Sequence, residues 1–299
     1  MFLGGADGNA ELRSPPLKNA LRYWWRITQG DTPKDKLLAK EQFLFGGVNE
    51  DKSSKPEMKA CRSLVDVVVT GEVKTEKQGS TVNIGAKNNP EVQAHHNPVS
   101  LSGYLGMGPI SMRGNKYEKM PIKPGEKFTL SITFPKDHEE EILEAVSLFA
   151  HFGALGARSK NGWGSIRVIS QSKEIELPNI SSVYRKYGAE LNEIFQIEKK
   201  YPFKLGLRKN GDKSSPLLWK IKYDGKDRWD KWEDAMKAAA WQYMDVRQTL
   251  KFPKEKPQGV QQRHIIGYPV TGHAVSNWGG NNGRMPSQLR IVIRKQGEE

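Results

Sequence analysis

Three cations recur at an interval of four residues near the start of the chain. Lys18, Arg22 and Arg26 share one stripe of an expected helix, and Arg13 precedes them. Like charges at this spacing destabilise a helix by roughly 0.2–0.5 kcal/mol per pair, and the helix itself contains no acid. A phosphate would relieve the repulsion, because the arginine fork fits it well. The stripe therefore indicates a nucleic-acid contact, with a solvated basic face as the alternative.

Two tryptophans lie beside this stripe. Trp24 shares the apolar face with Leu17 and Leu21, so we expect it in the core. Trp25 lies at the border between the stripe and the apolar face. Two roles stay open for Trp25, because it can stack on a base or be buried.

A glycine-rich segment, residues 153–164, is the second candidate for anion binding. Glycines let backbone N–H groups approach a phosphate closely, and a tight connection between elements is the alternative reason for them. The segment lacks the ending of a P-loop, and it follows a helix rather than a strand, which excludes a Rossmann fingerprint. Its charged and aromatic members add phosphate contacts and a stacking face. The RNA contacts predicted here are Gly156, Arg158, Ser159, Lys160, Gly162 and Trp163.

No clustered acid–base set is visible for catalysis. His151, before the glycine-rich segment, is the best candidate base among the 6 histidines, although a structural role is favoured. Asp7 lies in a Gly-rich stretch and suits a turn better than a cleavage role. His95 and His96 are adjacent, which does not suit one metal ion. We therefore predict no catalytic residue, no metal site and no cofactor.

Composition points to a polyanionic partner. The 299 residues carry 47 Lys and Arg against 34 Asp and Glu, a net charge of +13. Such a balance favours nucleic acid, with an anionic membrane surface as a distant second. Cys61 is the only cysteine, which excludes an intrachain disulfide and suits a reducing cytosol. We expect no transmembrane helix, because no apolar run approaches the required 18 residues, and the first residues do not resemble a signal peptide.

The expected elements around these candidates alternate between strand and helix. Ser14 is expected to cap a helix over 17–29. A buried strand is expected at 64–73, and an alternating strand at 127–134. Asp137 should cap the next helix, with Glu140 completing a capping box, before a strand at 165–169. The apolar stripe of this helix comprises Ile142, Ala145, Val146, Phe149 and Phe152.

A second unit begins near Gln171. We predict a strand at 217–223, a helix at 229–250, a Pro/Lys/Gln linker at 252–262 and a closing strand at 288–294. Long loops are expected at 46–60 and 75–98. Both units mix strands and helices, so the sequence predicts an α+β fold.

Several motifs carry a resemblance to a known family. These are GGADG at 4–8, ELRSPPLK at 11–18, ALRYWWR at 20–26, FGG at 45–47 and RSKNGWG at 158–164, with a looser match at 263–269. The chain resembles the RAMP superfamily and, within it, the first-named subunit of the Cmr complex, a type III-B CRISPR effector. The strong motifs cover about the first 165 residues.

The resemblance implies two ferredoxin-like βαββαβ units side by side, at 1–170 and 171–299. It further implies a cytoplasmic, non-catalytic subunit that holds guide RNA or target RNA near one end of the complex. Its partners would be other RAMP subunits, in antiviral defence. Two alternatives stay open, namely a RAMP endoribonuclease with His151 as base, and a mainly structural subunit. We expect the basic stripe and the glycine-rich segment to line one groove.

Overall fold

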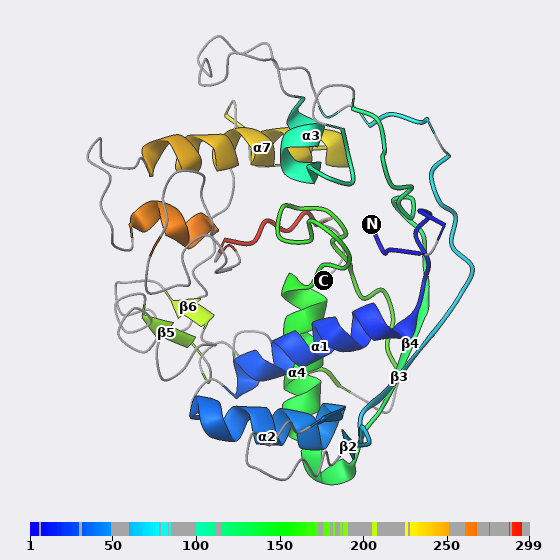
Figure 1. Ribbon diagram of the computed structural model, residues 1–299, viewed down its shortest axis with the longest axis vertical. Coiled ribbons are helices and arrows are strands. Elements are labelled where there is room, and N and C mark those ends of the chain that lie inside the picture. The colour runs from blue at the N-terminus through cyan, green and yellow to red at the C-terminus, as the bar shows by residue number, and fades with distance from the viewer. Residues whose placement is uncertain are drawn as a thin grey trace.

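Most of the regular elements that the structure describes lie in the first half of the chain (Figure 1). The computed structural model describes residues 1–5, 7–29, 32–48, 60–77, 79–82, 84, 100–111, 115–172, 176–179, 182, 186, 188–190, 205–207, 225–226, 228–250, 261–267, 275, 287 and 289–294. The predicted strand at 217–223 lies outside these residues, as does most of the linker at 252–262 and of the loops at 46–60 and 75–98.

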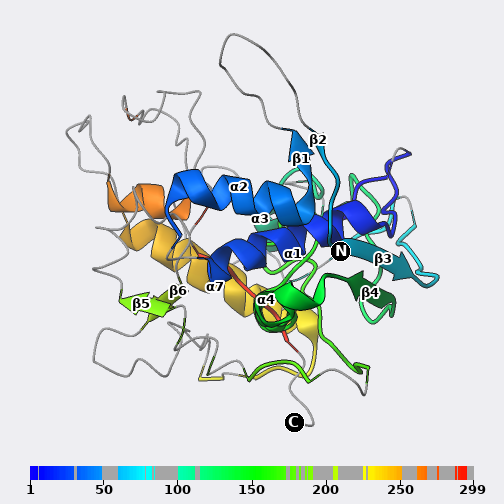
Figure 2. The same ribbon diagram turned by 90° about the horizontal axis from the view of Figure 1, so that it is seen from below.

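Helix α1 (Ser14–Thr28) carries the predicted basic stripe. Pro15 and Pro16 fit its first turn, where the backbone N–H groups have no partner within the helix. Ser14 is already helical and Arg13 is the N-cap residue, without a side-chain cap, so the predicted serine cap is wrong. The apolar face of α1 packs mainly on α4 (Glu139–Phe152). Figure 2 shows α1 between α4 and α2 (Lys34–Phe45).

Helix α4 follows a short 3-10 helix, η1 (Lys136–His138). Neither helix has a side-chain cap, so the predicted capping box at Asp137 and Glu140 is wrong. Three glutamates in the first turn of α4 still complement the helix dipole. The predicted apolar stripe is largely confirmed, because Ile142, Ala145 and Phe149 are buried against α1.

Strands β3 (Asp66–Thr70) and β4 (Thr129–Thr133) form an antiparallel pair with Val68 opposite Ser131. The prediction for 64–73 was a buried strand. In β3 only Val67 is buried and its neighbours are exposed, so the strand alternates between buried and exposed residues. Two further pairs are short: β1 (Gly47–Val48) with β2 (Ala60–Cys61), antiparallel, and β5 (Gly188–Glu190) with β6 (Leu205–Leu207), parallel.

Two hydrophobic clusters organise the interior. The first joins α1, α2, β3 and α4. The second joins α3 (Leu101–Gly106) and α7 (Trp232–Thr249) to Phe2 and Trp163. Figure 1 shows α3 and α7 together at one end of the molecule and α1, α2 and α4 at the other. Residues from both halves of the sequence therefore share the second cluster.

The mixed helix-and-strand composition is confirmed, whereas the two ferredoxin-like units stay a prediction. Within the described ranges the sheets are three separate two-stranded pairs. The predicted strand at 165–169 is reduced to one bridge between Ala154 and Ser165, and the predicted strand at 288–294 to one bridge between Asn161 and Ile291. None of the described helices is long and apolar enough to cross a membrane.

Candidate nucleic-acid interface

The basic stripe of α1 faces α2. Arg22 Nε and Arg26 Nη2 both donate to Oε1 of Glu41, and Arg26 Nε donates to Oε2 at 2.8 Å. The Glu41 side chain is only 5% exposed, whereas the arginine side chains are 28% and 27% exposed. The acid that is missing within α1 therefore comes from the next helix. Spacing along the chain does not reveal Glu41, because its pairing depends on how the two helices pack.

Glu41 is ionised despite its burial. Burial raises the pKa of this carboxyl, but the hydrogen bonds from Arg26 and Arg22 outweigh that effect and hold the pKa below its ordinary value. One negative charge thus offsets part of the stripe. An arginine has five N–H donors, so Arg22 retains donors for a phosphate beside its bond to Glu41.

The other two predicted contacts flank this pair. Arg13 is exposed directly before α1. Lys18 Nζ donates to Ser63 Oγ at 2.5 Å, and burial lowers the pKa of Lys18, although nearby Asp66 raises it. Lys18 is thus partly engaged by the protein, whereas Arg13 is exposed.

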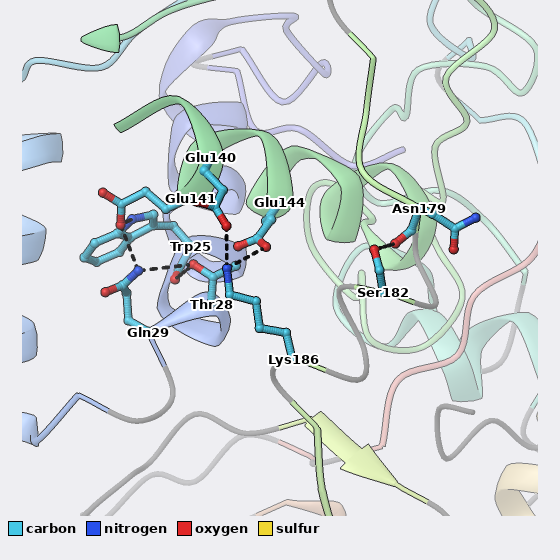
Figure 3. A network of polar contacts seen from close by, with 9 residues as sticks. All are labelled: Trp25, Thr28, Gln29, Glu140, Glu141, Glu144, Asn179, Ser182 and Lys186. Carbon is cyan, nitrogen blue, oxygen red and sulfur yellow. Dashed lines mark hydrogen bonds and ion pairs between the residues drawn. The ribbon is translucent and has the colours of Figure 1, made fainter. Parts of the chain in front are cut away.

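Trp25 lies inside the core. Its side chain is 0% exposed, and its Nε1 donates to Glu141 Oε2 at 2.8 Å. Gln29 Nε2 donates to the same oxygen at 2.8 Å, and Figure 3 shows the three side chains meeting at the first turns of α4. In the same view Lys186 bridges Glu140 and Glu144. The stacking role is therefore wrong for Trp25, and burial in the core is confirmed.

The glycines of residues 153–164 make room for protein atoms. Gly156 has a φ of +86°, and a Cβ there would lie 2.3 Å from the carbonyl oxygen of Phe2. Gly162 has a φ of +88°, and a Cβ there would lie 2.7 Å from Sδ of Met236 on α7. Both positions require glycine for conformation and for space. The predicted close approach exists, but its observed partners at these two glycines are Phe2 and α7.

Several amides of this segment are already bonded. Leu155 N donates to the Gly164 carbonyl, and Ala157 N donates to the Phe2 carbonyl, both at 2.9 Å. Asn161 N donates to the Arg158 carbonyl at 2.9 Å. These three N–H groups hold the loop together, so a phosphate would have to be held by other amides or by side chains.

Trp163 is also part of the core. It is 6% exposed and meets Phe2 edge-to-face, with ring centroids 5.4 Å apart, and Trp232 at 6.1 Å. The predicted stacking of Trp163 on RNA is therefore wrong, because its faces are covered by protein.

The two cations of the loop are more accessible. Arg158 is exposed in the left-handed region, with a φ of +59°, and its Nε donates to the Met107 carbonyl at 2.6 Å. Lys160 Nζ donates to the Ser287 carbonyl at 2.6 Å. Burial, followed by the nearby charge of Arg290, lowers the pKa of Lys160 to about 8. The loop therefore presents one permanent charge and one that titrates near neutral pH.

Arg290 joins this group from the C-terminal segment. Its guanidinium lies 5.5 Å from the ring centroid of Tyr23 and 5.3 Å from that of Trp24, within cation–π range. Tyr23 and Trp24 lie about 100° and about 160° around α1 from Arg22. Arg290 and the basic stripe therefore lie on different faces of α1, which does not favour the predicted single groove. Motif spacing does not reveal Arg290, because it lies in an expected strand far along the chain.

The catalytic candidates have structural partners. His151 Nδ1 bonds the Ser147 carbonyl at 2.8 Å, one turn earlier in α4. Asp7 accepts from the amide of Asn9 at 3.0 Å and from Asn9 Nδ2 at 2.7 Å, which is the turn geometry expected for it. Among the residues that the structure describes, no group of three His, Cys, Asp or Glu could hold a metal ion. His95 and His96 lie outside those residues.

Comparison with known proteins gives three similarities. A model of the RAMP superfamily matches residues 1–167. The CRISPR system Cmr subunit Cmr1-1 of Pyrococcus furiosus is 27% identical over 172 residues, which are 55% of this chain and 43% of that protein. The chain thus spans less than half of the length of this relative. The crystal structure of Cmr1 from Pyrococcus furiosus in its apo form is 15% identical, with a TM-score of 0.41 over 96% of this chain and 84% of that chain.

Proposed function

Because the chain belongs to the RAMP superfamily, we propose that it is a non-catalytic, RNA-binding subunit of a type III-B CRISPR effector of the Cmr type. The observation that carries the proposal is the family match over residues 1–167, which include α1 and the glycine-rich loop. The similarity to Cmr1-1 directs the proposal to the Cmr type within that family.

The charge distribution supports an RNA partner. The net charge is +13, and the exposed or half-buried cations Arg158, Lys160 and Arg290 gather around the glycine-rich loop. We assign the main phosphate contacts to these three side chains. Arg13, Lys18, Arg22 and Arg26 form a weaker, partly neutralised second surface. Gly156, Ser159 and Gly162 shape the loop that carries the main contacts.

The proposed RNA is the guide, the captured target or both, held at one end of the complex during antiviral defence in the cytoplasm. Phosphate contacts carry no base information, so binding should show little sequence preference. Partners would be other RAMP subunits of the Cmr type. We further propose that the chain is organised as two ferredoxin-like units, at 1–170 and 171–299.

Two assays on the purified chain test this function. Fluorescence anisotropy with a labelled oligouridine should show binding that weakens steeply with salt, because phosphate contacts release counterions. Gel analysis of the same RNA should show no products, with or without divalent metal. Absence of binding at low salt would favour the mainly structural subunit instead. Product bands that vanish in His151→Ala, but persist in a His138→Ala control, would favour a RAMP endoribonuclease.

A further inference from the structure

A second cluster of arginines lies where α3 packs on α7, on other elements than the α1 stripe. Arg247, in the last turn of α7, has its guanidinium 5.4 Å from the ring centroid of Tyr104 on α3 and 6.0 Å from that of Tyr243. The two tyrosine rings are 6.1 Å apart. Arg263, in η2 (Gln262–Ile266), donates through Nη1 to the Arg247 carbonyl. Figure 1 shows α3 beside α7. We call these four side chains the α3–α7 corner.

The α3–α7 corner concentrates positive charge in a half-buried place. All four side chains are half-buried. Burial lowers the pKa of Arg263, and the neighbouring charge of Arg247 lowers it further. Among the described residues, the groups whose charges shift the pKa of Arg263 and of Tyr104 are arginines and tyrosines.

Local structure accounts for where the two guanidiniums lie. Arg263 bonds a carbonyl at the C-terminal end of α7, where the helix dipole favours a cation. Arg247 lies over two aromatic rings, which attract a cation through their quadrupoles. These contacts orient the side chains, but they contribute no full negative charge. Placing two like charges together away from water is unfavourable without a counter-charge, so the corner is suited to an anion.

We propose that the α3–α7 corner binds a backbone phosphate of single-stranded RNA, with Arg247 as the main ligand and Arg263 as the second. This proposal rests on the RNA-binding function proposed above and adds a contact remote from the glycine-rich loop. A guanidinium fork bonds two phosphate oxygens in one plane, and the tyrosine rings hold that plane before RNA arrives. The same rings offer stacking surface for a neighbouring base, which favours RNA over an acidic peptide.

The test compares Arg247→Gln with Lys237→Gln, which removes one charge from the same helix about 15 Å away. Oligouridine affinity is measured by anisotropy over a series of salt concentrations, with a melting curve for each variant. Arg247→Gln should make the slope of log affinity against log salt shallower by about 0.7, which is about fivefold weaker binding at 0.1 M salt. Lys237→Gln should stay close to the wild type. Arg247→Lys should keep the slope and lose part of the affinity, because it keeps the charge without the fork.

The outcomes separate this site from the proposed function. If the wild type binds RNA and Arg247→Gln has the same affinity and the same slope, the α3–α7 corner is not an RNA-binding site. The proposed RNA-binding function would stay in place. No RNA binding by the wild type would overturn both. Polyglutamate serves as a second ligand that stands for an acidic protein. If Arg247→Gln loses polyglutamate binding and keeps RNA binding, the α3–α7 corner binds an acidic protein, and the proposal is overturned. Should Arg247→Gln melt early, Arg263→Gln decides in its place by the same change in slope, and Arg247→Lys decides by its loss of affinity.

Discussion

Two arginine pairs on different elements of this molecule have different electrostatic surroundings. Arg22 and Arg26 of α1 close on the buried carboxylate of Glu41. Arg247 and Arg263 pack on tyrosine rings and a backbone carbonyl instead. The first pair is the one that helical spacing makes conspicuous, whereas the second is separated in sequence and lies at the junction of α7 and η2.

Spacing along a helix thus identifies a basic surface, but it does not tell whether that surface is available to a ligand. An acid on a neighbouring helix turns a basic stripe into an internal salt bridge. A pair without such an acid keeps its charge for an external partner. Arg158 in the glycine-rich loop belongs with the second class, since it is exposed and bonds only a neutral carbonyl among the contacts described.

The largest expected effect is on stability. The double variant Arg22→Ala, Arg26→Ala leaves Glu41 buried without a counter-charge, which should lower the free energy of unfolding by about 3–5 kcal/mol. The matched variant Arg247→Ala, Arg263→Ala leaves no buried acid and should lose about 1–2 kcal/mol, from cation–π and helix-end contacts. Urea unfolding followed by tryptophan fluorescence measures both.

A triple variant controls for simple loss of packing. Adding Glu41→Gln to Arg22→Ala, Arg26→Ala removes the stranded charge and should restore part of the stability. Equal losses in the two double variants, or no recovery in the triple variant, would contradict the proposed difference between the pairs.

The pH dependence of stability should show the same difference. The pKa of Glu41 in the folded protein lies below its ordinary value. Ionised Glu41 therefore stabilises the fold at a pH above the ordinary pKa, and this stabilisation is lost as the pH falls through the pKa of the folded protein. Without the two arginines only burial acts on Glu41, and its pKa should rise above the ordinary value. The stability deficit of Arg22→Ala, Arg26→Ala should therefore shrink between pH 7 and about pH 4. A constant deficit over this window would argue against a stranded carboxylate.

A smaller effect concerns the pH dependence of RNA affinity, because Lys160 titrates near neutral pH and the arginines do not. The Lys160 pKa of about 8 means that this side chain loses its charge as the pH rises from 7 to 9. RNA affinity at 0.1 M salt should then fall by about fivefold over this range, the value of one phosphate contact. Lys160→Arg stays charged and should remove the dependence. An equal fall in Lys160→Arg would show that another group titrates.

Local sequence rules predicted the helices better than the strands. Proline in the first turn and apolar residues at helical spacing indicated α1 and α4, and both are present. The predicted strand at 165–169 failed because β-branched residues need a paired neighbour. Only Ser165 has a bridge, and Val168 and Ile169 are exposed.

The accessible cations of the candidate site could be predicted from the sequence, whereas the burial of its two tryptophans could not. The cations of the glycine-rich loop were expected, and they lie at half-buried or exposed positions. Trp25 lies only one position from the apolar stripe, so burial depended on where α4 packs and on Glu141 as a hydrogen-bond acceptor. Trp163 is covered by Phe2 and Trp232, which are remote in the sequence. Such non-local contacts are not encoded in the spacing of one helix or loop.

The salt dependence of oligouridine binding tests the central claim most directly, with Arg158→Gln compared against Arg22→Gln. Both remove one charge, and Arg22→Gln leaves Arg26 bonded to Glu41, so the fold is retained. Arg158→Gln should make the slope of log affinity against log salt shallower by about 0.7, and Arg22→Gln by less than about half of that. The full change in Arg22→Gln together with an unchanged slope in Arg158→Gln would contradict the claim that RNA binds where no acid neutralises the cations.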